Sequence, residues 1–220
     1  MKYYSKLTAT MLVLGTILMG TGVTTASANS SNPWKVYNWN PSGYALAPQP
    51  ANLSTSGVSF NFAPGVYAGT LMTTDSTLVG NLTGGSFAGT FSVTDMWPTA
   101  TFEAQASPCP ASTYVRFYFT TPGFAYDNYW WSNPIHVDLA NNGTGGVAPT
   151  SISTSLSDPT QWSDWNGQVA SSSPQVTAAF YAAQAKVNQA GVSFGGGCFF
   201  ENGVATSDGT GTFTLSGFND

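Results

Sequence analysis

Hydrophobic residues recur at every second position along much of this chain, which is the pattern of β-strands with one buried face. The alternation is clearest over residues 58–62 and 114–119, and it returns at 213–215 near the end of the chain. Another alternating run is interrupted by Gly84-Gly85, so a hairpin is expected over 77–94. The pattern predicts an all-β fold, and the length of the chain suits a single β-sandwich.

One segment has helical periodicity instead. Its apolar residues fall three or four positions apart: Val176, Phe180, Ala183 and Val187. Ser173 can cap a helix, Pro174 suits its first position, and Gly191 suits the position just past its end. We expect one amphipathic helix over about 174–190, packed against an end or a side of the sandwich.

The first residues have the layout of a secretory signal peptide. Two lysines precede the apolar stretch 11–19, and Ala26-Ser27-Ala28 forms a small-x-small cleavage site. After the leader, residues 40–56 are rich in Pro, Ser and Asn and favour a long loop. The expected organisation is a signal peptide over 1–28, a lead-in over 29–56 and a single domain over 57–220, exported to the cell exterior or periplasm.

The charge composition excludes several classes of partner. Only 7% of residues are charged, and without the leader three basic and ten acidic residues leave a formal net charge of −7. Such a chain repels nucleic acid and anionic lipid. No later stretch reaches the roughly 18 consecutive apolar residues of a membrane span. We therefore expect no nucleic-acid partner and no membrane span.

The sequence has two cysteines, Cys109 and Cys198. In an oxidising compartment they are expected to form a disulfide, and the alternative is two buried thiols. With a single histidine, His136, the chain cannot assemble the usual ligand set of a transition metal.

From Tyr114 onward, over about half of the chain, the order of features resembles the galactose-binding-like jelly rolls, in particular the laminin-B-like and complex-I-intermediate-associated branch. The segments that carry the resemblance are 114–119, 129–131, 162–167, the helix, 191–194 and 211–215. The chain is also similar to a group of uncharacterised secreted bacterial proteins that share the motifs at 130–134, 162–167 and 193–203. The resemblance implies a non-catalytic β-sandwich of jelly-roll type whose relatives often bind sugars or other extracellular polymers, sometimes with a structural calcium ion.

Aromatic residues are candidates for sugar binding, because flat rings pack against the C–H faces of pyranoses. On a strand, Asn128 and Trp130 share one face and Trp131 points to the other. One tryptophan would then lie in the core and the other would meet a ligand; alternatively, both are buried. Trp162 and Trp165 either form a second platform or clamp the helix.

Arg116 and Tyr118 lie opposite the apolar face of their own strand. The arginine fork can bind two hydroxyls or a uronic carboxylate, or else form a salt bridge with Glu103 or an aspartate. Glu201 and Asn202 follow a glycine-rich run and are candidate sugar or calcium ligands. The alternative for them is a plain Asn-Gly turn with a solvated glutamate.

These residues predict a non-catalytic module that binds an extracellular glycan, without a cofactor, although a structural calcium ion is left open. One alternative is a structural or adhesive protein. The other is a glycosidase or polysaccharide lyase that uses Glu103 and Glu201, if a Cys109–Cys198 bridge brings these two carboxylates together.

Overall fold

The computed structural model describes residues 32–40, 43–105, 112–123, 125–133, 137–139, 146–195 and 202–219. The chain divides into residues 1–31 and a compact unit over 32–220, and all described residues belong to the second. The expected leader, His136, Cys109, Cys198 and Glu201 therefore lie outside the described residues.

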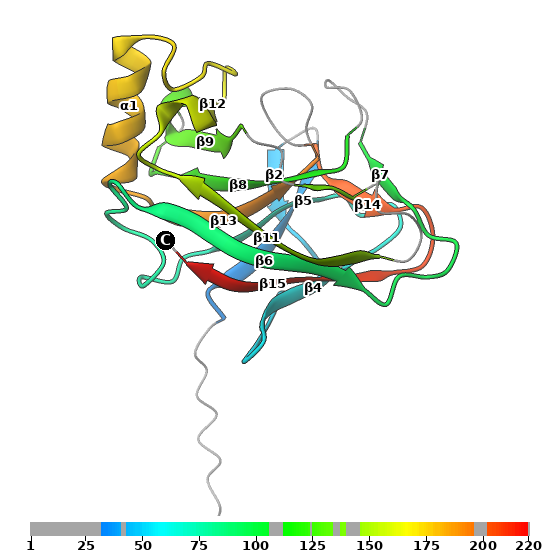
Figure 1. Ribbon diagram of the computed structural model, residues 1–220. Coiled ribbons are helices and arrows are strands. Elements are labelled where there is room, and N and C mark those ends of the chain that lie inside the picture. The colour runs from blue at the N-terminus through cyan, green and yellow to red at the C-terminus, as the bar shows by residue number, and fades with distance from the viewer. Residues whose placement is uncertain are drawn as a thin grey trace, which may run out of the picture. The chain divides into compact units, whose positions relative to one another are not determined.

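The described residues form two antiparallel sheets that pack face to face, a large sheet of ten strands and a small sheet of five. The main path of the large sheet is β12 (Trp162–Asp164), β9 (Tyr129–Ser132), β8 (Tyr114–Thr120), β13 (Gln189–Phe194), β5 (Ala68–Thr73), β1 (Trp34–Asn40) and β2 (Gly43–Leu46). Three short strands pair beside this path: β10 (Val137–Asp138), β14 (Val204–Thr206) and β7 (Phe102–Ala104). The small sheet runs in the order β11 (Val147–Ser155), β6 (Ser86–Thr94), β15 (Gly211–Asn219), β4 (Gly57–Phe62) and β3 (Asn52–Ser54). Figure 1 shows the large sheet lying above the small one.

The all-β sandwich predicted from the alternation is confirmed. The chain crosses repeatedly between the two sheets, as it does in jelly-roll sandwiches. Phenylalanines from both sheets interlock in the core: the ring centroids of Phe60, Phe62 and Phe213 lie 5.5, 5.3 and 5.0 Å from that of Phe194. The side chains that alternate along each strand therefore bring the two sheets together through their inward faces.

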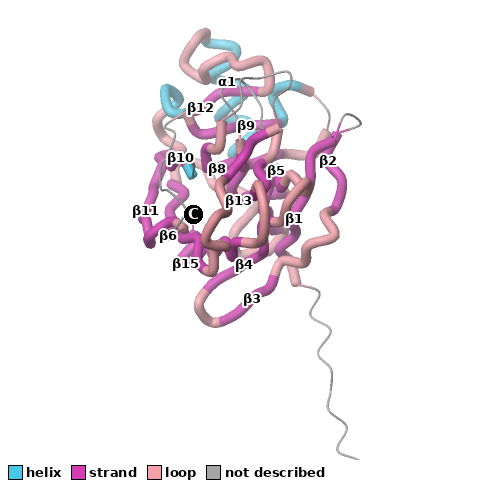
Figure 2. The backbone as a smooth tube through the Cα atoms, turned by 90° about the vertical axis from the view of Figure 1, so that its right-hand side faces the viewer, coloured by secondary structure: helices cyan, strands magenta, loops and turns pink. Residues whose placement is uncertain are grey.

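The described part of the chain contains one α-helix, α1 (Pro174–Gln184), at one end of the sandwich beside β9 and β12 (Figures 1 and 2). It begins where the sequence predicts, because the Ser173 Oγ accepts a hydrogen bond of 3.2 Å from the backbone N–H of Val176. It ends earlier than predicted, since the chain soon enters β13 and Gly191 lies within that strand. No helix in the described residues is long and apolar enough to cross a membrane.

The hairpin expected over 77–94 is wrong in its first half. β6 is a strand, but residues 77–85 form turns and bridges. Gly80 exchanges two backbone hydrogen bonds of 2.9 Å with Val187, and the N–H of Leu82 donates to the carbonyl of Gln184. The segment therefore pairs with the chain around the end of α1 rather than with β6.

The stretch 29–56, expected to be a lead-in, contains three strands in its described residues. β1 and β2 belong to the large sheet and β3 to the small sheet. Trp34 and Val36 of β1 are buried in the core, while Pro48 and Pro50 lie between β2 and β3. This stretch is therefore part of the sandwich, and the alternation of buried Trp34 and Val36 with exposed Lys35 in β1 is the sequence signal that marks it.

Candidate ligand-binding face of the large sheet

The outer face of the large sheet, opposite the core, carries polar and aromatic side chains that are buried. In β8, Val115, Phe117 and Phe119 face the core, and strand geometry turns Arg116 and Tyr118 to the outer face. Arg116 is only 7% exposed and Tyr118 only 2%. Antiparallel sheets commonly leave their second face in water, so the burial of this face is a distinctive feature of the fold.

A row of three polar residues crosses this face. Arg116 of β8 pairs with Ser193 of β13, and Ser193 pairs with Thr70 of β5. Because directly paired residues point to the same side of a sheet, the three side chains lie next to one another. We call Arg116, Ser193 and Thr70 the polar row; Ser193 and Thr70 are 0% and 1% exposed.

Several polar atoms at this place are buried without a hydrogen-bond partner. Within the described part of the chain, no partner exists for the Oγ of Ser193, the Oγ1 of Thr70 or the Nε1 of Trp131. A buried polar group left unsatisfied costs about 1–3 kcal/mol. Native proteins normally supply such groups with bound water, an ion or a ligand. The polar row therefore has unused hydrogen-bonding capacity, which bound water or a ligand could satisfy.

Aromatic rings adjoin the polar row and run toward α1. Trp131 of β9 pairs with Tyr118, and their ring centroids lie 4.8 Å apart. Tyr129, Trp165 and Tyr126 continue the series, with Tyr129 and Tyr126 at 4.7 and 6.3 Å from Trp165. We call these five residues the aromatic stripe. Exposure rises from 1% at Trp131 to 59% at Tyr126, so one end of the stripe is open to solvent.

Trp130 and Asn128 do not belong to this face. Trp130 is fully buried on the core side, where its indole N–H donates to the carbonyl of Asp127 at 2.8 Å. The Asn128 amide donates to the carbonyl of Pro122 at 2.7 Å and thereby holds its own loop. Trp130 and Trp131 are thus both buried, because both faces of β9 are covered. Of the two alternatives that the sequence offered, the structure has two buried tryptophans rather than one buried and one exposed.

Asn202 lies in a close backbone contact near the end of β13. A Cβ added to Gly195, whose φ is +99°, would come within 3.3 Å of the backbone nitrogen of Asn202. The Asn202 amide donates to the carbonyl of Gln105 at 2.9 Å, while its Oδ1 has no partner among the described residues. Glu103 is exposed and accepts a hydrogen bond of 3.2 Å from the Tyr67 hydroxyl. Burial and this carboxylate raise the pKa of Tyr67.

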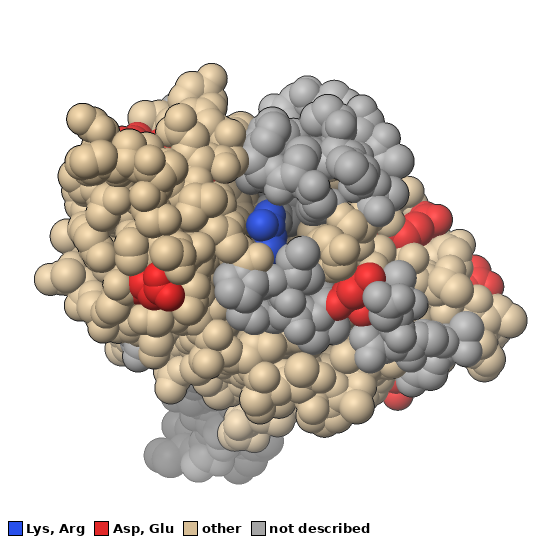
Figure 3. Space-filling model, turned by 45° about the horizontal axis from the view of Figure 1, so that its top comes forward, with Lys and Arg blue, Asp and Glu red and all other residues tan. Residues whose placement is uncertain are grey.

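Charge is sparse on the outer face of the large sheet. Figure 3 brings this face toward the viewer and shows one visible basic group, with carboxylates spaced apart around it. The strand positions of Lys35 and Arg116 place both on this face, with Lys35 exposed. Among the described residues, no group of three or more His, Cys, Asp or Glu side chains could hold a metal ion.

The sequence signals for Ser193 and Thr70 are weak, because each is a single small polar residue that belongs to no recognisable motif. For Trp165 the sequence predicts either a sugar-binding platform or a clamp on the helix, and the residue lies half-buried within the aromatic stripe. The chain was compared with protein-family models, curated proteins and solved structures, and it matches none of them. The chemistry of the site is therefore argued from its own geometry.

Proposed function

We propose that this protein is a secreted, non-catalytic module that binds carbohydrate with the outer face of its large sheet. The observation that carries the proposal is the pair of buried hydroxyls of Ser193 and Thr70, which have no hydrogen-bond partner among the described residues and lie beside the aromatic stripe. Sugar hydroxyls both donate and accept hydrogen bonds, so they match hydroxyl groups of the protein better than purely ionic ligands do. The aromatic rings supply apolar surface for the C–H faces of the same ligand.

The charge balance favours a neutral glycan. A strongly acidic chain repels polyanions over distances of about one Debye length, roughly 8 Å at physiological salt. Arg116 supplies a donor fork within the polar row, and the remaining groups of the site are neutral hydroxyls, an indole N–H and rings.

The test is affinity electrophoresis of the leaderless protein in gels that contain neutral soluble polysaccharides. The key variant combines Ser193→Ala and Thr70→Val, which remove two hydroxyls and keep the side-chain volumes nearly unchanged. Each lost hydrogen bond is worth about 1 kcal/mol, so the dissociation constant should rise at least about tenfold. The matched control combines Ser92→Ala and Thr214→Val on the outer face of the small sheet, and it should bind as the wild type does.

Equal retardation of the two double variants would overturn the assignment of the site. If no polysaccharide retards the wild type, carbohydrate binding itself is refuted. Released reducing ends or unsaturated sugars would instead support the enzyme alternative and contradict a non-catalytic role.

A further inference from the structure

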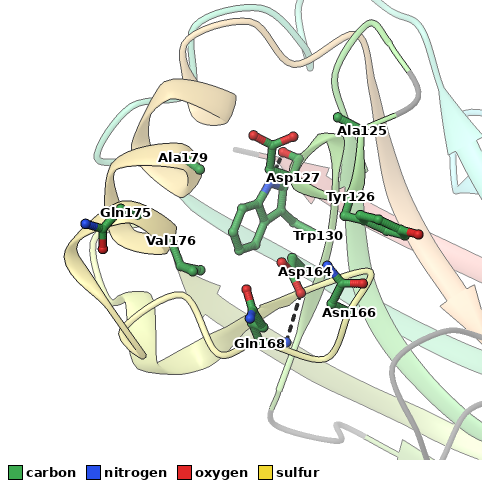
Figure 4. Close-up of a pocket in the computed structure, with 10 residues that line it drawn as sticks. All are labelled: Ala125, Tyr126, Asp127, Trp130, Asp164, Asn166, Gln168, Gln175, Val176 and Ala179. Atoms are coloured by element: carbon green, nitrogen blue, oxygen red, sulfur yellow. Dashed lines mark hydrogen bonds between the residues drawn. The ribbon is translucent and has the colours of Figure 1, made fainter.

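A cavity of about 310 Å³ lies at the junction of η1 (Tyr126–Asn128), the turn after β12 and α1. Figure 4 shows Asp127 and Asp164 on opposite sides of the Trp130 indole, with Val176 and Ala179 of α1 facing it. Small-molecule sites begin at about 300 Å³, so this cavity suits a ligand with a single ring. Tyr126, the exposed end of the aromatic stripe, also lines it.

The walls of the cavity are fixed by packing and by local hydrogen bonds. Phe180 of α1 packs on Trp130, with ring centroids 4.9 Å apart, which anchors the helical wall to the sheet. On the opposite wall, the Oδ1 of Asp164 accepts a hydrogen bond of 2.8 Å from the backbone N–H of Gln168 (Figure 4). The turn is completed by Gly167, whose φ of +74° suits glycine. The cavity is therefore preformed.

The lining of the cavity is acidic and rich in amides. It contains two carboxylates, those of Asp127 and Asp164, and three amide side chains, while the described residues that line it include no basic group. Asp164 is only 3% exposed. Burial raises the pKa of this carboxyl, backbone hydrogen bonds from Gln168 and Asn166 partly oppose that rise, and the negative charge of Asp127 adds to it. A positive group bound beside Asp127 would offset the repulsion between the two negative charges.

We propose that this cavity binds an amino sugar residue through its protonated amino group. The ammonium would lie at the rim of the cavity beside the exposed carboxylate of Asp127, to which it would donate charge-assisted hydrogen bonds, and the charge of Asp164 on the far side of the indole would add to the attraction. The amides of Asn166 and Gln168 offer donors and acceptors to ring hydroxyls, and the methyl groups of Val176 and Ala179 meet ring C–H groups. A simple polyamine would leave the amides without partners. The choice of a sugar rests on the proposed function, whereas the demand for a cation follows from the cavity alone.

The experiment is isothermal titration of the leaderless protein with glucosamine, glucose and N-acetylglucosamine at pH 7. Glucosamine should bind at least about tenfold more tightly than either neutral sugar, because only it carries the charge. Asp127→Asn and Asp164→Asn should each remove this preference. Asp95→Asn, in the turn after β6, makes the same change of charge elsewhere and should leave the preference intact. The Asp127 side chain is exposed, so its variant tests the site even if Asp164→Asn fails to fold.

Equal affinities for the three sugars, or a preference that survives Asp127→Asn, would overturn the inference. Binding of Ca²⁺ that is lost in both aspartate variants would do so too, because the carboxylates would then serve a metal ion. The two proposals fail separately. The Ser193→Ala and Thr70→Val double variant should keep its preference for glucosamine, and the aspartate variants should keep their retardation by neutral polysaccharide.

Discussion

Phe180 is the side chain that should anchor α1, and with it one wall of the cavity, to the sandwich. It is fully buried, and its ring centroid lies 4.9 Å from that of Trp130, 5.9 Å from Trp162 and 6.2 Å from Phe119. Phe180→Ala would remove the ring from the centre of this cluster. The three remaining rings belong to strands of the large sheet, so they cannot easily close the space that is left.

The expected loss follows from these contacts. Phenylalanine-to-alanine changes in protein cores cost about 3–5 kcal/mol, and the cost is highest where the surroundings cannot collapse. Aromatic pairs add about 0.5–1.5 kcal/mol each beyond the area they bury. We therefore expect a loss of about 4 kcal/mol in the free energy of unfolding. For a domain of this size, that corresponds to a decrease in Tm of about 8–16 °C.

The assay is urea unfolding followed by tryptophan fluorescence, with Tyr181→Ala as the matched control. Tyr181 is the next residue of the same helix and is 39% exposed, so its loss should cost less than about 1 kcal/mol. If Phe180→Ala costs no more than Tyr181→Ala, the helix is not packed on the sheet as described and the wall of the cavity is not preformed.

Two further predictions concern polar groups. Ser193→Ala should raise the free energy of unfolding by about 1 kcal/mol in the absence of ligand, because it removes a buried hydroxyl that has no partner among the described residues. The control, Ser92→Ala, should change the free energy of unfolding by less than about 0.5 kcal/mol. If urea unfolding shows that Ser193→Ala is less stable than the wild type, the assignment of an unpartnered hydroxyl is contradicted. The pKa of Asp164 is higher in the folded protein than in the unfolded chain, so as pH rises the unfolded chain loses this proton first. The protonated carboxyl therefore contributes stability at low pH, and this contribution is lost as pH rises from about 3.9 to the folded-state pKa. The difference in Tm between Asp164→Asn and the wild type should therefore be more favourable to the variant at pH 7 than at pH 3. An equal difference at the two pH values would refute the raised pKa.

Strand alternation carried most of the prediction of the fold. It works well for β4 and β8, where an unbroken period of two can be recognised from one strand alone. It failed over 77–85, because those residues pair with the chain near the end of α1, and no local pattern records so distant a partner. The length of the helix was overestimated for a related reason: Val187 continues the helical spacing, yet its backbone is bonded to Gly80.

The site was only partly predictable. The position of Arg116 opposite its own apolar face follows from β8 alone, and so does that of Tyr118. Ser193 and Thr70 became candidates only through their register with Arg116, which joins residues far apart in the chain. Trp130 and Trp131 are equivalent by composition, and the packing of α1 over the core-side tryptophan distinguishes them. A linear pattern determines the face of a residue, but not what covers that face.

Tyr126 connects the two proposed sites, because it ends the aromatic stripe and also lines the cavity beside α1. A glycan that lies along the stripe could therefore place one residue in the cavity while others meet the polar row. Two weak contacts on one chain act as a single stronger one, since the second contact forms at a high effective concentration. The acidic cavity then selects for an amino group, and the neutral hydroxyls of the polar row accept many glycans. This division would let a surface with little charge combine general adhesion to polysaccharide with a preference for one kind of residue.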